Sequence, residues 1–102
     1  MEALFRAYKL VLVERRRPLG ATAQLLRVYQ VLTLLAGQSR DYSKQEFARD
    51  VYLLDESEAK ETRDGHRVRF PASSGTRTSA ALSTVTKSGE LKVYYGIAFD
   101  GP

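Results

Sequence analysis

The sequence predicts an α+β fold, with helices in the N-terminal half and strands in the C-terminal third. Apolar residues recur at helical spacing as far as residue 54, and they alternate with polar residues from residue 91 onward. The segment 55–65 between these regions is polar and has no apolar period. A chain of 102 residues is long enough to bury one core, so we expect residues 1–102 to form a single domain.

Residues 2–17 are expected to form the first helix. Leu4, Phe5, Tyr8 and Val11 recur at the spacing of one helix face. The basic run 15–17 suits the C-terminal end of a helix, and the following Pro-Leu-Gly ends it. A strand over residues 9–13 is the alternative, because long and β-branched apolar side chains follow one another there.

The second helix is expected over residues 22–36, with Thr22 as its N-cap and Gly37 just beyond its end. Apolar side chains cover most of its circumference, and Arg27 and Gln30 mark a narrow polar strip. A helix that is apolar nearly all round is expected to be central and buried.

The third helix is expected over residues 43–54. Ser43 and Glu46 have the spacing of a capping box, in which each side chain bonds the other residue's backbone N–H. Tyr42 and Phe47 flank the cap and can form a hydrophobic staple.

The remaining elements are a short strand over residues 66–70 and a longer strand region over 91–99, which Gly96 can split in two. Residues 78–87 are open to two interpretations. A helix has a plausible start at Thr78 and stop at Gly89, whereas Thr84, Val85 and Thr86 favour a strand of a hairpin. The strand alternative gives three helices on a three-stranded antiparallel meander.

The composition argues against most enzyme classes. The chain has no Cys and one His, which excludes disulfides, thiol nucleophiles and Cys-ligated or multi-His metal sites. His66 lies among basic residues at a strand start, and the acidic residues of 55–61 lack the spacing of a calcium loop. We therefore expect no enzyme activity, no metal and no cofactor. The apolar runs are too short for a membrane span and the start of the chain lacks signal-peptide features, so a cytoplasmic protein without membrane contact is expected.

The segment from Thr76 to Gly96 resembles the recognition helix and wing of winged helix-turn-helix DNA-binding proteins. It has a polar helix start, an inward Leu82 and Val85, a Lys-Ser-Gly stop and then an alternating strand. Residues 25–36 and 42–54 resemble the first two helices of that family, which leaves residues 1–17 as an extra N-terminal helix. The resemblance implies a DNA interface formed by Thr76, Arg77, Thr78 and Ser79 at the helix start, Ser83 and Lys87 along the helix, and Lys92 and Tyr94 on the wing.

A net charge of +4 suits an anionic partner. The sequence thus predicts a duplex DNA-binding protein, as in a transcription regulator or a plasmid or phage replication-partition factor. If residues 78–87 are a strand, Arg67, Arg69 and Lys92 form a basic sheet face instead. The alternative function is a protein-interaction or assembly module that uses the first helix. Its apolar stripe packs on the core or on a second copy in a homodimer, through Leu4, Phe5, Tyr8 and Val11.

Overall fold

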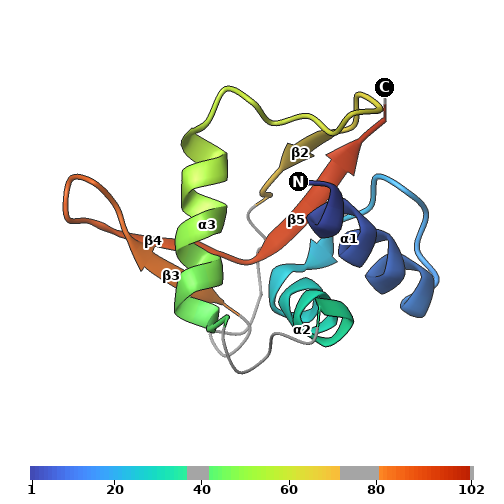
Figure 1. Cartoon of the computed structure of the whole chain (residues 1–102), viewed down its shortest axis with the longest axis horizontal. Helices are drawn as coiled ribbons and strands as arrows, with labels where there is room; N and C mark the ends of the chain where they lie inside the picture. The colour runs from blue at the N-terminus through green and yellow to red at the C-terminus, as the bar shows by residue number, and fades with distance from the viewer. Residues whose placement is uncertain (37–41, 72–80, 102) are drawn as a thin grey trace.

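The computed structural model describes residues 1–36, 42–71 and 81–101. Helices and strands are mixed in this part of the chain, so the predicted α+β class is confirmed (Figure 1). The elements in chain order are α1 (Glu2–Glu14), β1 (Ala23–Gln24), α2 (Leu25–Ala36), α3 (Lys44–Glu56), β2 (Arg67–Arg69), β3 (Leu82–Val85), β4 (Leu91–Tyr94) and β5 (Gly96–Asp100).

The strands form two separate antiparallel sheets. One has three strands in the order β1-β5-β2, with Val68 opposite Phe99, and the other is the β3-β4 hairpin, with Leu82 opposite Tyr94. Tyr95 alone separates β4 from β5, so one extended stretch of chain runs from the hairpin into the three-stranded sheet (Figure 1). The break agrees with the predicted interruption of the 91–99 strand region.

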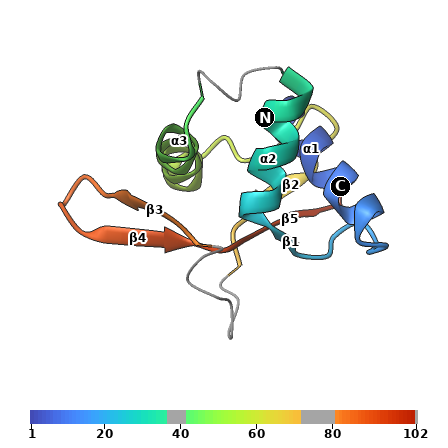
Figure 2. The ribbon, with the colours of Figure 1, turned by 90° about the horizontal axis from the view of Figure 1, so that it is seen from below.

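The core lies between the helices and the three-stranded sheet. Helices α1 and α2 lie on one face of that sheet (Figure 2), where the Phe99 ring is 4.8 Å from the Phe5 ring and 5.1 Å from the Tyr8 ring, centroid to centroid. The largest fully buried side chains come from every layer of this arrangement: Tyr8, Val11, Leu25, Val28, Val51, Val68, Ile97 and Phe99.

Helix α1 ends earlier than predicted, at Glu14 rather than residue 17. Arg16 has a φ of 54°, in the left-handed region that ends a right-handed helix. Because the chain reverses there, Arg15 to Arg17 form the turn after the helix. The alternative strand over residues 9–13 is wrong.

Helix α2 begins at Leu25, so the predicted N-cap Thr22 is wrong. Ala23 and Gln24 pair with β5 as a short strand, and the Leu25 N–H then donates to the Tyr95 carbonyl at 2.9 Å. The start of α2 is therefore fixed by a partner far along the chain. Gly37 lies outside the described residues. The helix is not buried all round, because Leu34 is 79% exposed.

Helix α3 has the predicted N-terminal cap. The Glu46 N–H donates to Ser43 Oγ at 3.1 Å, and the Ser43 N–H donates to Glu46 Oε1 at 3.1 Å. The Tyr42 and Phe47 rings meet edge to face with centroids 6.1 Å apart, as the staple requires. The helix continues two residues beyond the predicted end, to Glu56.

The predicted recognition helix over residues 78–87 is wrong where the structure describes it. Residues 82–85 form β3, with Thr84 opposite Lys92 and Val85 opposite Leu91. The β-branched residues thus follow their strand preference once a pairing partner is present. The alternative three-stranded meander is also wrong, since the strand around Val68 pairs with β5 and the hairpin stands apart.

The hairpin is attached to α3 by its inner face. Leu82 and Tyr94 are 4% exposed, and the Tyr94 hydroxyl donates to Asp55 Oδ2 at 2.8 Å. The Lys87 N–H donates to the Tyr52 hydroxyl at 3.2 Å. Beyond these contacts the hairpin extends away from the helices and the larger sheet (Figures 1 and 2).

Candidate nucleic-acid interface

Four predicted DNA contacts, Thr76, Arg77, Thr78 and Ser79, lie outside the described residues. Ser83 lies on β3 and Lys87 lies in the turn of the hairpin, and both are exposed. They belong to a β ribbon and not to a helix, so the helix-based geometry expected for them does not apply.

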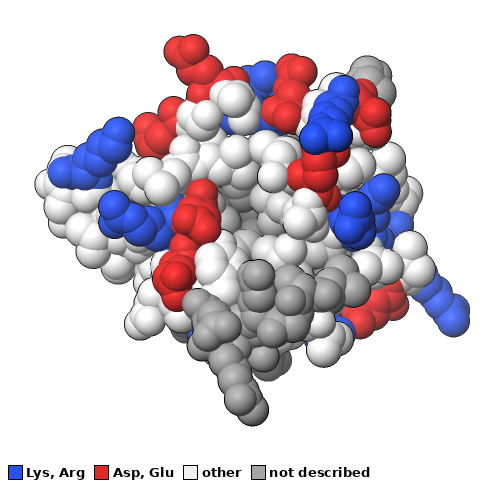
Figure 3. Space-filling model, in the orientation of Figure 1, with Lys and Arg blue, Asp and Glu red and all other residues white. Residues whose placement is uncertain are grey.

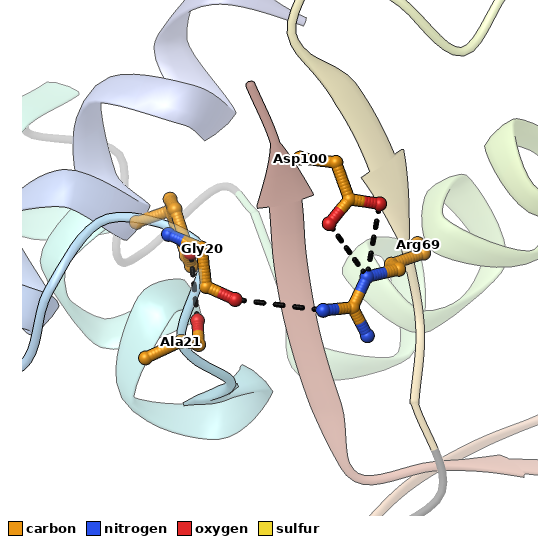
Figure 4. Close-up of polar contacts among 5 residues, drawn as sticks. Gly20, Ala21, Arg69 and Asp100 are labelled. Atoms are coloured by element: carbon orange, nitrogen blue, oxygen red, sulfur yellow. Dashed lines mark hydrogen bonds and ion pairs between the residues drawn. The ribbon is translucent and has the colours of Figure 1, made fainter.

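Arg67 and Arg69 are exposed on β2, but both form ion pairs. Arg69 Nε lies 3.0 and 3.1 Å from the two carboxylate oxygens of Asp100, and its Nη2 donates to the Gly20 carbonyl at 3.4 Å (Figure 4). Arg67 Nη1 lies 3.5 Å from Glu61 Oε1. The predicted basic sheet face of Arg67, Arg69 and Lys92 is wrong, because Lys92 lies on β4 in the other sheet and both arginines are ion-paired. Arg69 instead joins β2, β5 and the turn before β1.

Lys92 and Tyr94 both approach Asp55 of α3. Lys92 Nζ is 3.9 Å from Asp55 Oδ2, the same oxygen that accepts the Tyr94 hydroxyl. Burial and this hydrogen bond raise the pKa of Tyr94 above its ordinary value. The prediction that Tyr94 contacts a DNA backbone is wrong, because the side chain is enclosed between the hairpin and α3.

The apolar stripe of α1 packs on the chain's own core. Phe5, Tyr8 and Val11 are 7%, 0% and 1% exposed, which leaves no area for a second copy. Leu4 is half-buried and lines an apolar cleft of about 290 Å³ together with residues of α2 and α3. Of the two packing alternatives, the structure therefore has the intramolecular one, and the homodimer face on α1 is wrong.

Exposed basic side chains lie on α1 and on the turn that follows it, and the sequence-based assignment does not include them. We call Arg6, Lys9, Arg15, Arg16 and Arg17 the α1 basic strip, and all five are exposed. Within the described residues only Arg15 approaches a carboxylate, Glu14, at 3.9 Å. Lys9 Nζ also lies 4.7 Å from the centre of the Phe5 ring.

The acidic residues of α1 are held by other groups. Arg27 forms a two-pronged ion pair with Glu14, at 2.9 and 2.6 Å, and this hydrogen bonding lowers the pKa of the Glu14 carboxyl. Glu2 Oε2 accepts the Arg63 N–H at 3.1 Å. Apart from the 3.9 Å contact of Arg15 with Glu14, no basic residue of the strip forms an ion pair within the described residues.

The excess of basic residues near the start of the chain is a sequence signal for this strip. Residues 1–17 hold five basic and two acidic residues, and Arg6 and Lys9 fall opposite the apolar stripe. The helix dipole accounts for the location of the charges in the run 15–17 but not for their number. The face of the molecule shown in Figure 3 carries charges of both signs.

Among the residues that the structure describes, no three His, Asp or Glu side chains come together in a way that could hold a metal ion. No helix in the same ranges is both long and apolar enough to cross a lipid bilayer. Comparisons of the chain with models of protein families, with curated proteins and with solved structures found no match.

Proposed function

We propose that the protein binds duplex DNA and that the α1 basic strip is the main contact with the phosphate backbone. The observation that carries this proposal is the presence of five exposed cations along one helix and the turn after it, with its acidic neighbours engaged elsewhere. From Arg6 to the end of α1 at Glu14 the helix rises by about 12 Å, which matches about three to four phosphate spacings along one DNA strand.

The order of elements supports the proposal. Helices α2 and α3 follow β1 in the chain, and β5 returns between β1 and β2 in the sheet. This is the order of helices and strands in winged helix domains, displaced by one helix from the sequence-based assignment.

The charge of α3 argues for placing the contact on α1. The exposed residues of α3 include Lys44 and Arg49, but also Glu46, Asp50 and Glu56. Such a surface gains little from a phosphate backbone, because attraction and repulsion nearly cancel. Base contacts from α3 are therefore not part of the proposal.

The test is a salt titration of binding to a mixed-sequence duplex. Each phosphate contact adds about 0.9 to the slope of log Kobs against log salt concentration. We expect Arg16→Ala with Arg17→Ala to reduce that slope by about 2. The matched control is Arg67→Ala with Arg69→Ala, which removes the same net charge from an ion-paired surface and should change the slope by much less.

Two results would contradict the proposal. Absence of duplex binding at low salt removes the function itself. A larger loss of slope in the Arg67 and Arg69 variant than in the Arg16 and Arg17 variant moves the interface from α1 to β2.

A second candidate function is protein binding through the outer face of the hairpin. Val85, Leu91 and Val93 point away from α3 and are 60%, 69% and 37% exposed. Adjacent exposed apolar side chains on a projecting ribbon are typical of an interaction surface. Self-association in sedimentation that is lost in Val85→Lys with Leu91→Lys, and retained in the exposed control Leu34→Lys, supports this candidate.

A further inference from the structure

A small cleft lies between the end of α1 and β1. Its volume is about 230 Å³, and its floor includes the buried side chains of Val11, Leu12 and Ala23. Its exposed rim carries only polar and basic residues, namely Arg15, Arg17, Thr22 and Gln24. The rim thus supplies two guanidinium groups, a hydroxyl and a side-chain amide, all of which can donate hydrogen bonds.

The net charge at this cleft is strongly positive. Arg15 and Arg17 at the rim contribute two full charges. Glu14, the acidic residue next to them in the chain, is ion-paired mainly with Arg27 and has only a 3.9 Å contact with Arg15. The C-terminal end of a helix opposes them with about half a negative charge. Two of its carbonyl groups are also satisfied, because Leu12 and Val13 accept the N–H groups of Arg17 and Arg16 at 2.8 and 3.1 Å. The guanidinium charges therefore dominate.

The backbone at this turn adopts a conformation that is unfavourable for an arginine. The two hydrogen bonds just described are those of a Schellman motif, whose left-handed residue is usually glycine. Here that residue is Arg16, with a φ of 54°, the one positive φ found at a non-glycine position in the described ranges. Such outliers gather at functional sites, where the chain tolerates a cost in stability. Because the chain reverses at Arg16, Arg15 and Arg17 both reach the cleft.

We propose that this cleft binds a phosphate group, with Arg15 and Arg17 pairing with its oxygens and with Thr22 and Gln24 donating further hydrogen bonds. Guanidinium groups suit phosphate because their planar N–H pairs match two of its oxygens. The inference rests on the proposed function, in which a backbone phosphate of the bound duplex occupies the cleft. A free phosphorylated molecule has the same chemistry and is distinguished by experiment.

The experiment follows the backbone amide signals of the full chain by NMR during three titrations, with inorganic phosphate, a 5′-mononucleotide and a mixed-sequence duplex. We expect the amides of Thr22, Ala23 and Gln24 to shift with the duplex. Gln24→Glu places a negative charge at the rim and should weaken duplex binding about tenfold or more. Gln45→Glu makes the same change of charge on α3, away from the cleft, and should have little effect.

Thr22→Val keeps the shape of the side chain and removes only the hydroxyl, so a two- to fivefold loss is expected from one lost hydrogen bond. Equal effects of the Gln24 and Gln45 variants overturn the cleft proposal while leaving duplex binding by the α1 basic strip intact. If the amide signals of residues 22–24 shift with the mononucleotide or phosphate and the duplex does not bind, the cleft binds a free phosphorylated ligand and the proposed function is refuted. No shift at residues 22–24 with any of the three probes refutes the cleft.

Discussion

Arg27 of α2 holds Glu14 of α1 through a two-pronged ion pair, with Nε 2.9 Å from Oε1 and Nη2 2.6 Å from Oε2. The pair connects the first turn of α2 to the last residue of α1. It also removes a negative charge from the neighbourhood of Arg15, Arg16 and Arg17. The positive character of that turn therefore depends on a residue of another helix.

Arg27→Ala should raise the pKa of Glu14 toward its ordinary value, because the hydrogen bonds from Arg27 are the main cause of its lowered pKa. A carboxyl with a lowered pKa in the folded state stabilises the fold above its ordinary pKa, and this contribution is lost as the pH falls through the lowered value. A carboxyl NMR titration of both proteins measures the change. An unchanged Glu14 titration contradicts the assigned pairing.

Arg16→Gly should increase the free energy of unfolding by about 1 kcal/mol, because glycine adopts a positive φ without the steric cost paid by arginine. Arg17→Gly removes the same charge at a position without a positive φ and should not stabilise the protein. Urea denaturation of the two variants separates the backbone effect from the charge effect. If both variants behave alike, the left-handed conformation of Arg16 stores no strain.

Tyr94→Phe should lower the free energy of unfolding by about 1–2 kcal/mol, since it removes the hydrogen bond to Asp55 that fastens the hairpin to α3. The raised pKa of Tyr94 means that its neutral form stabilises the fold below the ordinary phenol pKa of about 10. That contribution is lost as the pH rises through the raised value. Stability measured across alkaline pH should fall in the parent protein, and less steeply in the variant.

Gly96→Ala should destabilise the three-stranded sheet by about 1–3 kcal/mol through steric crowding. A Cβ at this position would lie 2.6 Å from Thr22 Cγ2 and 3.3 Å from the Pro71 carbonyl oxygen. Gly101→Ala is the control, because a Cβ there meets nothing within 4 Å. Thermal unfolding of the two variants gives the comparison, and equal midpoints contradict the close approach of Thr22 and Pro71 to Gly96.

The sequence by itself determined the features that depend on neighbours along the chain. Helical spacing located α1 and α3, the Ser43 and Glu46 pattern gave the start of α3, and alternation located the C-terminal strands. These helix predictions succeeded because capping and amphipathic periodicity act within one or two helical turns. For the same reason the fold class followed from the pattern of elements.

Only the tertiary structure decided what depends on distant partners. Leu82 to Val85 form a strand because they pair with β4. Ala23 and Gln24 lie outside the helix because they pair with β5. Whether a basic side chain is ion-paired also depends on distant residues. Arg69 pairs with Asp100, 31 residues away, while the α1 basic strip has no such distant partner among the described residues. Local preferences and charge counts do not contain these pairings, because they arise from contacts that form only when the chain folds.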